Sequence, residues 1–457
     1  MINNRDRFPA AQANGKKTTP RVFPGEEKID KPNGLYDSYQ MINNGSCGIQ
    51  SDQETSMSMR TSWRASGLLA AALWCAASAA QAQTIKIGLP VPLSGPYGAE
   101  AQDQVRNAEL AVKQFNDAGG LDGRKAQLLV RDDRLNPAEA ATRALELIEK
   151  DGVNFIVGGL SAATQLSINN VTRQRKKLYI SISQSDAINE ASDASPYTFH
   201  EALNPHMTTQ AVGKYVFKPG MRVAFLTADY AYGHEMTRGF TEVARQQGAE
   251  VVGEVKHPLG ASDYSAFLPR LKALNPDVLV FNNFGADNRI SIKQAADFGM
   301  KRNIRFVTPI LTYTARVSGG AATYQDVVGG TQYYWAIQDS VPSAKAFNAA
   351  FQAENNGRFP SDYGAMAYSA VKSLLLAVRD AGSTDTDEVA AALRKLKYDT
   401  YKGAQYYRGC DQQSVQSVLV IQSVGKDNAH PDEVFKLLHT EAPSEQILRS
   451  CQALGFK

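Results

Sequence analysis

The sequence predicts an α/β protein with parallel sheets that carry helices on both faces. Short apolar strands alternate with amphipathic helices along most of the chain. The strands are continuous apolar runs, which is typical of strands buried on both faces of a parallel sheet. The alternation forms two series, each about the size of one domain, with a break near 197–205.

The first series opens with an apolar strand at 84–91, followed by the loop PLSGPYG. Apolar residues at helical spacing predict a helix over 100–118, and Gly119-Gly120 ends it in the usual place. Asn136 is the expected N-cap of another helix, with Pro137 at its first position. The later elements of the series are strand 127–130, helix 136–150, strand 154–157, helix 167–176 and strand 178–183.

The second series repeats this rhythm and is followed by three helices and two strands. Its strands are predicted at 222–227, 250–255, 278–284 and 305–307, with helices near 233–247, 264–274 and 287–298. The closing elements are helices 343–355, 362–381 and 385–397 and strands 404–408 and 415–424. Open parallel sheets bind ligands at the carboxyl ends of their strands. The loops at those ends, among them GGLSAATQ, SQSD and DYAYG, carry hydroxyl groups and no catalytic set.

Composition narrows the function classes. The chain has 457 residues, of which 43 % are hydrophobic and 21 % charged, and its formal net charge is +3. This is ordinary globular composition, which excludes collagen-like, coiled-coil and wholly disordered proteins. The near-neutral balance argues against a nucleic-acid partner. No apolar run reaches about 18 residues, so a multi-span membrane protein is excluded.

The N-terminus reads as two different segments. Residues 1–56 are polar and dotted with Pro, Gly and Asn, so we predict a disordered extension that lies upstream of the true start, Met57 or Met59. Residues 57–82 have the parts of a secretory signal peptide: two arginines, an apolar stretch and Ala80-Gln81-Ala82. We expect cleavage after Ala82 and a periplasmic protein.

The number of cysteines in the exported chain is consistent with a disulfide-forming compartment. After the expected cleavage only Cys410 and Cys451 remain. Two cysteines in an oxidising compartment favour one disulfide over two free buried thiols.

Known catalytic and cofactor motifs are missing from the sequence. It has no GxxxxGK[ST], no GxGxxG and no G-x-S-x-G. His234-Glu235 begins like a zinc-protease helix, but Arg238 stands where the second histidine is needed. The six histidines show no paired ligand spacing. We therefore predict no catalytic residue, no cofactor and no metal, and favour binding over catalysis.

At this point the order of the segments carries a family likeness. The segments TIKIGLPVPLSGPYG, FNDAGG, RDD, FIVGGLSAATQ, ADYAYG and VLVFNNF resemble those of type I periplasmic binding proteins, most closely the leucine/isoleucine/valine-binding family that serves ABC importers. The resemblance is collinear over nearly all of 84–457. It implies two doubly wound parallel-sheet lobes joined by three hinge crossings. Lobe 1 would be 84–203 plus 334–401. Lobe 2 would be 204–333 plus 402–457 and would contain the disulfide.

The resemblance also implies a ligand site between the lobes. It places the carboxylate-binding serine at Ser161, a second hydroxyl at Ser185 and a backbone carbonyl partner at Ser183. Hydroxyl and backbone N–H groups can hold a carboxylate, and aromatic rings can line the apolar part of a ligand. The aromatic positions of the family fall on Tyr97, Tyr232 and Phe284. A turn serine or a packed core ring is the alternative for each.

One departure bears on the ligand. Amino-acid binders of the family have an acid in the region RFVTPILTYTA, where this chain has Ile310 and Leu311. A buried ammonium without a partner is costly. We therefore expect a carboxylate without an amino group, such as an aromatic acid, to bind better than leucine, with Tyr313 as a further wall. The ending YYRGCDQQSVQSVLVIQSV resembles a subgroup in which some members take up aromatic acids. Branched-chain amino acids are the alternative, with Asp229 as the stand-in charge partner.

The expected partners are the small-molecule ligand and the permease and ATPase subunits of an ABC importer. A ligand-sensing periplasmic receptor subunit and a periplasmic enzyme on the same fold remain alternatives.

Overall fold

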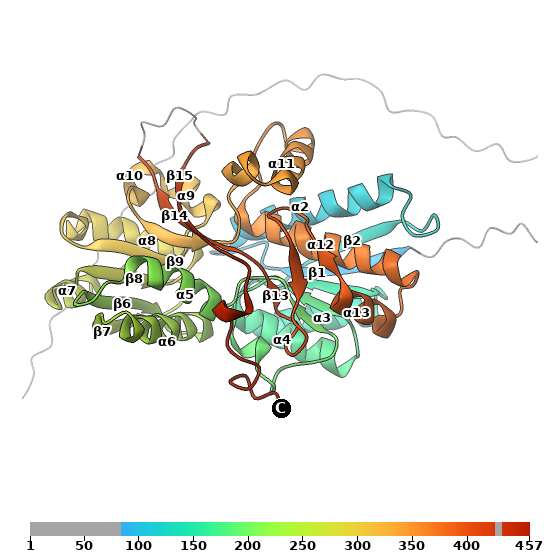
Figure 1. Ribbon diagram of the computed structural model, residues 1–457, viewed down its shortest axis with the longest axis horizontal. Coiled ribbons are helices and arrows are strands. Elements are labelled where there is room, and N and C mark those ends of the chain that lie inside the picture. Colours follow the sequence, from blue (N-terminus) through green and yellow to red (C-terminus); the bar gives the residue numbers. More distant parts are fainter. Residues whose placement is uncertain (1–83, 426–431) are drawn as a thin grey trace, which may run out of the picture. The chain divides into compact units, whose positions relative to one another are not determined.

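The computed structural model describes residues 84–425 and 432–457. The predicted extension at 1–56 and the predicted signal peptide at 57–82 lie outside this range. The described chain forms two α/β lobes, each built on its own sheet (Figure 1). This matches the fold class expected from the alternation of strands and helices.

The first lobe contains a five-stranded parallel sheet in the order β2-β1-β3-β4-β5. Its strands are β1 (Ile85–Val91), β2 (Ala126–Asp132), β3 (Phe155–Gly158), β4 (Tyr179–Ser181) and β5 (Thr198–His200). Its helices are α2 (Gly98–Asp117), α3 (Pro137–Glu149), α4 (Ala162–Gln174) and the short η1 (Ala187–Asn189). Every residue of β1 except Lys86 is buried, as a strand covered on both faces requires.

Three later helices complete this lobe. They are α11 (Pro342–Glu354), α12 (Asp362–Ala381) and α13 (Thr386–Lys395). In Figure 1, α12 (orange) runs beside α2 (blue), and the hydroxyl of Tyr368 on α12 donates to Gln114 on α2 at 2.8 Å. The chain therefore returns to its first lobe after the second has been built.

The second lobe contains a seven-stranded sheet in the order β15-β14-β10-β9-β8-β6-β7. Its strands are β6 (Arg222–Ala228), β7 (Glu250–His257), β8 (Val278–Asn282), β9 (Arg305–Ile310), β10 (Val328–Thr331), β14 (Val418–Ser423) and β15 (Phe435–Glu441). Its helices are α5 (Pro205–Val216), α6 (Ala231–Gln246), α7 (Leu268–Ala273), α8 (Gly285–Asp297), α9 (Tyr313–Gly319) and α10 (Ala321–Tyr324), with η2 (Met300–Arg302) and η4 (Glu445–Ile447). The sheet is mixed, because β14 runs antiparallel to both β10 and β15.

The crossings between the lobes meet at a small three-stranded sheet of β11 (Lys397–Tyr398), β12 (Gln405–Tyr407) and β13 (Ser414–Val415). Glu201, at the first crossing, accepts hydrogen bonds from the hydroxyls of Tyr398 at 2.5 Å and Tyr407 at 2.8 Å. Gln332, before η3 (Trp335–Asp339) at the second crossing, accepts from the backbone N–H of Leu203 at 3.0 Å and donates to the hydroxyl of Tyr401 at 2.9 Å. Residues from all three crossings thus share one buried polar network.

Several elements were missing from the sequence-based prediction or differ from it. Strands β5, β10 and β15 and helix α5 were not predicted. The reason is visible in α5, whose buried side includes Thr208, Thr209 and Gln210, and in β10, whose sequence is VGGT. Neither has the apolar pattern on which the prediction depends. The strand expected at 415–424 is interrupted, and α4 starts at Ala162 instead of 167.

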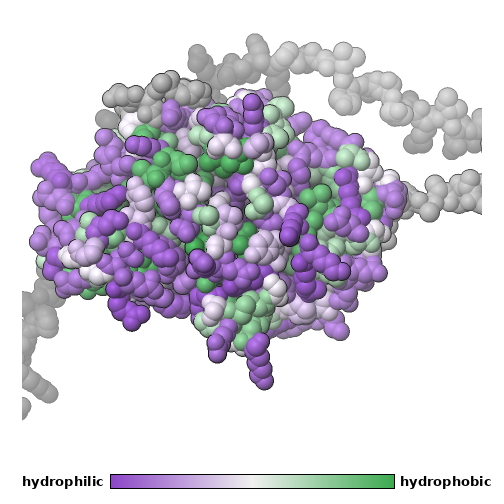
Figure 2. All heavy atoms as spheres, in the orientation of Figure 1, coloured by the Kyte–Doolittle hydropathy of each residue, from purple (hydrophilic) through white to green (hydrophobic). Residues whose placement is uncertain are grey.

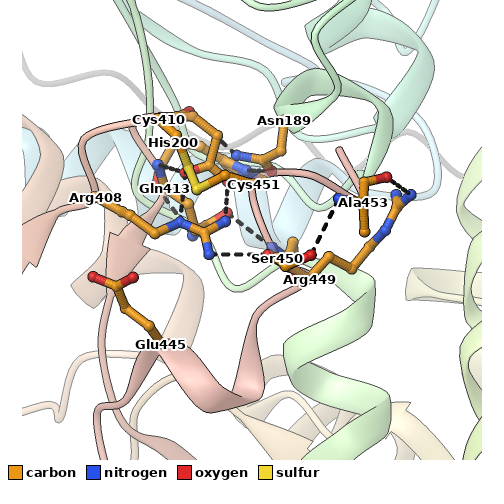
Figure 3. A network of polar contacts seen from close by, with 12 residues as sticks. Asn189, His200, Arg408, Cys410, Gln413, Glu445, Arg449, Ser450, Cys451 and Ala453 are labelled. Carbon is orange, nitrogen blue, oxygen red and sulfur yellow. Dashed lines mark hydrogen bonds and ion pairs between the residues drawn. A yellow bond between two sulfur atoms is a disulfide. The ribbon is translucent and has the colours of Figure 1, made fainter. Parts of the chain in front are cut away.

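The predicted disulfide between Cys410 and Cys451 is present (Figure 3). It joins the turn between β12 and β13 to the C-terminal tail, next to the crossings and not inside the seven-stranded sheet. Beside it, Arg408 donates to the backbone carbonyl of Arg449 at 2.9 Å. The tail then packs on the first lobe, where Ala191 N–H donates to the carbonyl of Leu454 at 2.9 Å.

The face drawn in Figure 2 is mostly hydrophilic, with apolar residues in small separate groups. Within residues 84–425 and 432–457, no helix has the length and hydropathy needed to cross a membrane.

Candidate ligand-binding cleft

The structure places all six predicted ligand residues just beyond the ends of strands, in both lobes. Tyr97 follows β1, Ser161 follows β3, Ser183 and Ser185 follow β4, Tyr232 follows β6 and Phe284 follows β8. Each is at least 95 % buried. This is the edge of an open parallel sheet at which ligands bind.

Aromatic rings join the two lobes at this edge. The rings of Tyr97 and Phe284 pack edge to face with centroids 4.9 Å apart. Phe284 also lies 5.0 Å from Tyr363 and 6.4 Å from Tyr232. The hydroxyls of Tyr97 and Tyr230 are 3.0 Å apart. These rings pack directly on one another across the lobes, and they form an aromatic surface that an apolar ligand entering between the lobes would meet.

Gly285 shows how closely the lobes approach here. Its φ is +59°, and a Cβ at this position would lie 2.5 Å from a ring carbon of Tyr97. A side chain at 285 would therefore push the second lobe away from Tyr97, so the packing of Tyr97 on Phe284 depends on this glycine.

Ser161 is the N-cap of α4. Its Oγ accepts from the backbone N–H of Thr164 at 3.1 Å, and the Thr164 hydroxyl accepts from the Ser161 N–H at 3.2 Å. This capping box fixes the start of the helix. The N-terminus of a helix favours negative charge, so this end of α4 suits a carboxylate.

The two serines after β4 are held differently. The carbonyl of Ser183 lies 2.6 Å from Nε2 of His200, a ring whose pKa burial lowers to about 4. The Oγ of Ser183 is buried and, within the described part of the chain, has no hydrogen-bond partner. The hydroxyl of Ser185 donates to Oε1 of Glu235, on the opposite lobe, at 3.0 Å.

Other buried polar atoms near these residues are also unpaired. Among the described residues, Gln104 Oε1, Gln184 Oε1 and the Tyr232 hydroxyl have no hydrogen-bond partner. Gln104 lies against the segment after β4, since its Nε2 donates to the carbonyl of Ile182 at 3.5 Å. A buried polar atom left unpaired is costly, so these groups are candidates to contact a ligand.

Carboxyl groups that the sequence did not indicate lie between the lobes. Asp362 accepts from the backbone N–H of Tyr313 at 3.1 Å, and Glu100 accepts from the hydroxyl of Thr314 at 2.6 Å. Both acids come from the first lobe and meet the segment in which the family's acid is missing. Burial raises the pKa of Asp362 to about 8, and it also raises the pKa of Glu100. Burial raises the pKa of Glu235 to about 7, with help from Asp186.

Asp229, the expected stand-in for that acid, lies elsewhere. Its side chain is 55 % exposed and pairs with His234 at 2.8 Å and with Lys256 at 3.9 Å. Tyr313, the expected extra wall, lines a cavity of about 320 Å³ between α2, α9 and the end of α11, together with Arg106 and Phe359. Neither residue packs against the rings of Tyr97 and Phe284 in the contacts described above.

The residues missed by sequence reasoning had weak signals. Tyr230 stands in the quoted segment ADYAYG, two residues before Tyr232, and could have been found there. Tyr363 and Asp362 open a helix far along the chain, with nothing local that links them to the cleft. No group of three or more His, Cys, Asp or Glu suited to a metal occurs in the described ranges.

Comparisons with known proteins agree with this architecture. Residues 84–429 match the family model described as "Periplasmic binding protein". The chain is 26 % identical over 325 residues to the "Leucine-, isoleucine-, valine-, threonine-, and alanine-binding protein" of Pseudomonas aeruginosa, which covers 70 % of this chain and 85 % of the relative.

Solved structures give the same picture. A periplasmic binding protein from Burkholderia mallei superposes with a TM-score of 0.74 at 29 % identity and covers 81 % of this chain and 97 % of its own. A solute-binding protein of an ABC transporter from Rhodopseudomonas palustris BisB5, solved with 3,4-dihydroxy benzoic acid, has a TM-score of 0.70 at 24 % identity and covers 79 % and 98 %. The second likeness is informative about the fold alone.

Proposed function

This chain belongs to the periplasmic binding protein family, as an ABC transporter substrate-binding protein of the leucine-binding group, and from that premise we propose that it captures a small carboxylate between its lobes. The captured ligand then passes to permease and ATPase subunits. Export by the predicted signal peptide at 57–82 places the protein in the periplasm. The ranges 84–203 plus 334–401 and 204–333 plus 402–457 for the two lobes are part of this proposal. Strands β14 and β15 support the second range because they join the seven-stranded sheet, whereas β12 and β13 belong to the small sheet at the crossings. The homologues of this chain are solute-binding proteins and not enzymes.

The observation that carries the proposal is the meeting of strand ends from both sheets. On one side stands the capped N-terminus of α4 at Ser161, which favours an anion. On the other, Phe284 packs against Tyr97 across the lobes. Tyr232 and Ser183 complete the proposed site, whereas the hydroxyl of Ser185 already donates to Glu235 of the other lobe. The arrangement offers one end for a carboxylate and an aromatic wall for an apolar body.

The charges favour a ligand without an ammonium group. No acid stands at 310–311. Asp362 meets the neighbouring Tyr313, and burial raises its pKa to about 8, so without a ligand an ionised partner for an ammonium group is not already in place there. An aromatic acid is therefore the favoured ligand class, and the bound 3,4-dihydroxy benzoic acid of the Rhodopseudomonas palustris protein is an example of that chemistry. Branched-chain amino acids, suggested by the name of the Pseudomonas aeruginosa relative, are the alternative.

Calorimetry on the mature protein tests the ligand class. We expect benzoates or phenylpropanoids to bind with a dissociation constant near micromolar, which corresponds to a binding free energy of about −8 kcal/mol. Leucine, isoleucine and valine should bind more weakly. Micromolar leucine binding with no binding of any acid that lacks an amino group would overturn this assignment.

Replacing Ser161 with alanine is expected to weaken any bound carboxylate by about 1–3 kcal/mol, because a hydrogen bond to a charged group is lost. The matched control is Asn136→Ala, which removes the N-cap of α3 in the same lobe. Both changes should lower stability by about 1 kcal/mol, but only Ser161→Ala should change the affinity measured by calorimetry. Equal affinity of the Ser161→Ala variant and the wild type would show that the carboxylate binds elsewhere.

A further inference from the structure

Glu235, on α6 of the second lobe, reaches across to the first lobe. Its carboxylate accepts from the Ser185 hydroxyl at 3.0 Å, from the Asp186 N–H at 3.1 Å and from the Ala187 N–H at 3.4 Å. The side chain is 6 % exposed. Three donors of one short segment thus converge on a single acid that lies outside their own lobe.

A second set of contacts supports this crossing. Asp186 accepts from Arg238, one turn further along α6, at 2.9 Å and from the backbone N–H of His206, on α5, at 3.0 Å. We call Ser185, Asp186, Ala187, Glu235 and Arg238 the inter-lobe clasp. All five lie at the boundary between the segment after β4 and the helices α5 and α6.

The clasp uses one donor, the Ser185 hydroxyl, that the sequence analysis assigned to a ligand, together with two backbone N–H groups that it did not. A hydroxyl and two consecutive N–H groups at the start of η1 are suited to a carboxylate. In the structure the carboxylate that they hold belongs to the protein itself. Ser185 therefore contributes to holding the lobes together, while the N-terminus of α4 is left for the ligand.

We propose that Glu235 is a positioning residue for ligand capture, which bridges the lobes through Ser185, Asp186 and Ala187 and favours their closure before a ligand arrives. The inference rests on the proposed function, because closure matters only if a ligand is held between the lobes. A larger closed fraction raises the apparent affinity in proportion, since only the closed form holds the ligand with both lobes.

The clasp makes closure depend on pH, and the direction follows from the burial of Glu235. Burial, with a smaller effect of Asp186, raises its pKa to about 7 in this structure, where the clasp is formed and which we take as the closed form. In an open form the exposed carboxyl returns toward about 4.3. The closed form therefore binds a proton that the open form lacks, so closure strengthens as the pH falls through 7 and weakens as it rises.

The charged and titratable groups that face Glu235 are Asp186, Arg238 on α6 and Tyr230 just before α6. Asp186 in turn faces His206 on α5, which also faces Glu242, Lys214 and Arg449. Burial lowers the pKa of His206. Glu190 and Arg449, which pair with each other at 2.7 Å, lie further along the same boundary.

The experiment measures closure without any ligand. Spin labels are attached through Thr142→Cys on α3 and Lys272→Cys on α7, two exposed positions in different lobes. The distance between the two spin labels is measured by pulsed electron paramagnetic resonance on the full mature protein. The protein is first freed of ligand by unfolding and refolding with its disulfide intact. In the wild type the population with the shorter distance should rise at least about threefold between about pH 8 and about pH 5.5.

Two variants and a control make the test specific. Glu235→Gln resembles the protonated acid, so it should show the same closed population at both pH values. Glu235→Ala should lose most of that population at both. Glu254→Gln, at an exposed acid on β7 of the same lobe, should behave as the wild type. Circular dichroism of each variant verifies that it is folded.

The inference is overturned if Glu235→Gln keeps the wild-type pH response or if Glu235→Ala leaves the distances unchanged. A wild type with the same distances at both pH values also overturns it. None of these outcomes depends on which solute binds, so failure of the proposed ligand class would appear separately, in the calorimetry.

Discussion

Replacing Cys410 and Cys451 with serine is expected to lower the free energy of unfolding of the mature protein by about 4 kcal/mol. The two cysteines are 41 residues apart in the sequence, so their bond removes a large loop-closure entropy from the unfolded chain. The bond also fixes the C-terminal tail, where Ala191 N–H donates to Leu454. Urea unfolding of the oxidised wild type and of the double variant gives the difference.

The single variants Cys410→Ser and Cys451→Ser are the controls. Each breaks the same bond, so each should lose about as much stability as the double variant. A loss below about 1 kcal/mol in all three would contradict the prediction and would mean that tail packing, and not the covalent link, holds this region.

Glu201→Ala is expected to cost about 3–5 kcal/mol of stability, because it breaks a buried set of charged and polar groups at the crossings. Glu201 is fully buried and accepts from Tyr398, Tyr407 and Gln405. The ammonium of Lys402 is buried nearby and donates to the carbonyls of Gln332 and Ser417, each at 3.0 Å. Burial raises the pKa of Glu201 and lowers that of Lys402.

Glu201→Gln is the matched control, since it keeps the volume and one acceptor oxygen for the two tyrosine hydroxyls. Glu201→Gln should lower the stability measured by thermal unfolding clearly less than Glu201→Ala does. Asp297→Ala, at an exposed ion pair with Lys293 on α8, should change stability by less than about 0.5 kcal/mol. Equal losses for Glu201→Gln and Glu201→Ala would show that the network needs the charge itself.

Much of the fold could be predicted because local patterns and tertiary burial agree. Strand β1 is a run of apolar residues in which Ile85, Ile87 and Leu89 become fully buried. Asn136 caps α3 as expected, accepting from the N–H groups of Ala138 and Glu139. Prediction failed where the local sequence pattern and tertiary burial disagree. Helix α5 buries threonines and a glutamine, and β10 contains two glycines, so neither has an apolar period.

The site was predicted in part for the same reason. The family resemblance placed Ser161, Tyr97, Tyr232 and Phe284, and the order of elements puts each of them just after a strand, near one edge of its sheet. The residues that these side chains contact in the other lobe cannot be predicted from the order of elements. Glu235 meets Ser185 from another lobe, and in the sequence it stands out only as half of an incomplete zinc motif. Asp362 reaches Tyr313 from a helix that belongs to the first lobe.

Identification of the captured solute tests the central claim most directly. The mature protein is incubated with a mixture of small metabolites, freed of unbound solutes, denatured, and the released compound identified by mass spectrometry. The Ser161→Ala variant, which should bind a carboxylate more weakly, serves as the control. The account predicts release of a small carboxylate, with an aromatic acid favoured over leucine, in larger amount from the wild type than from the variant. Release of a sugar, a phosphate ester or a cation, or of equal amounts from both proteins, would contradict it.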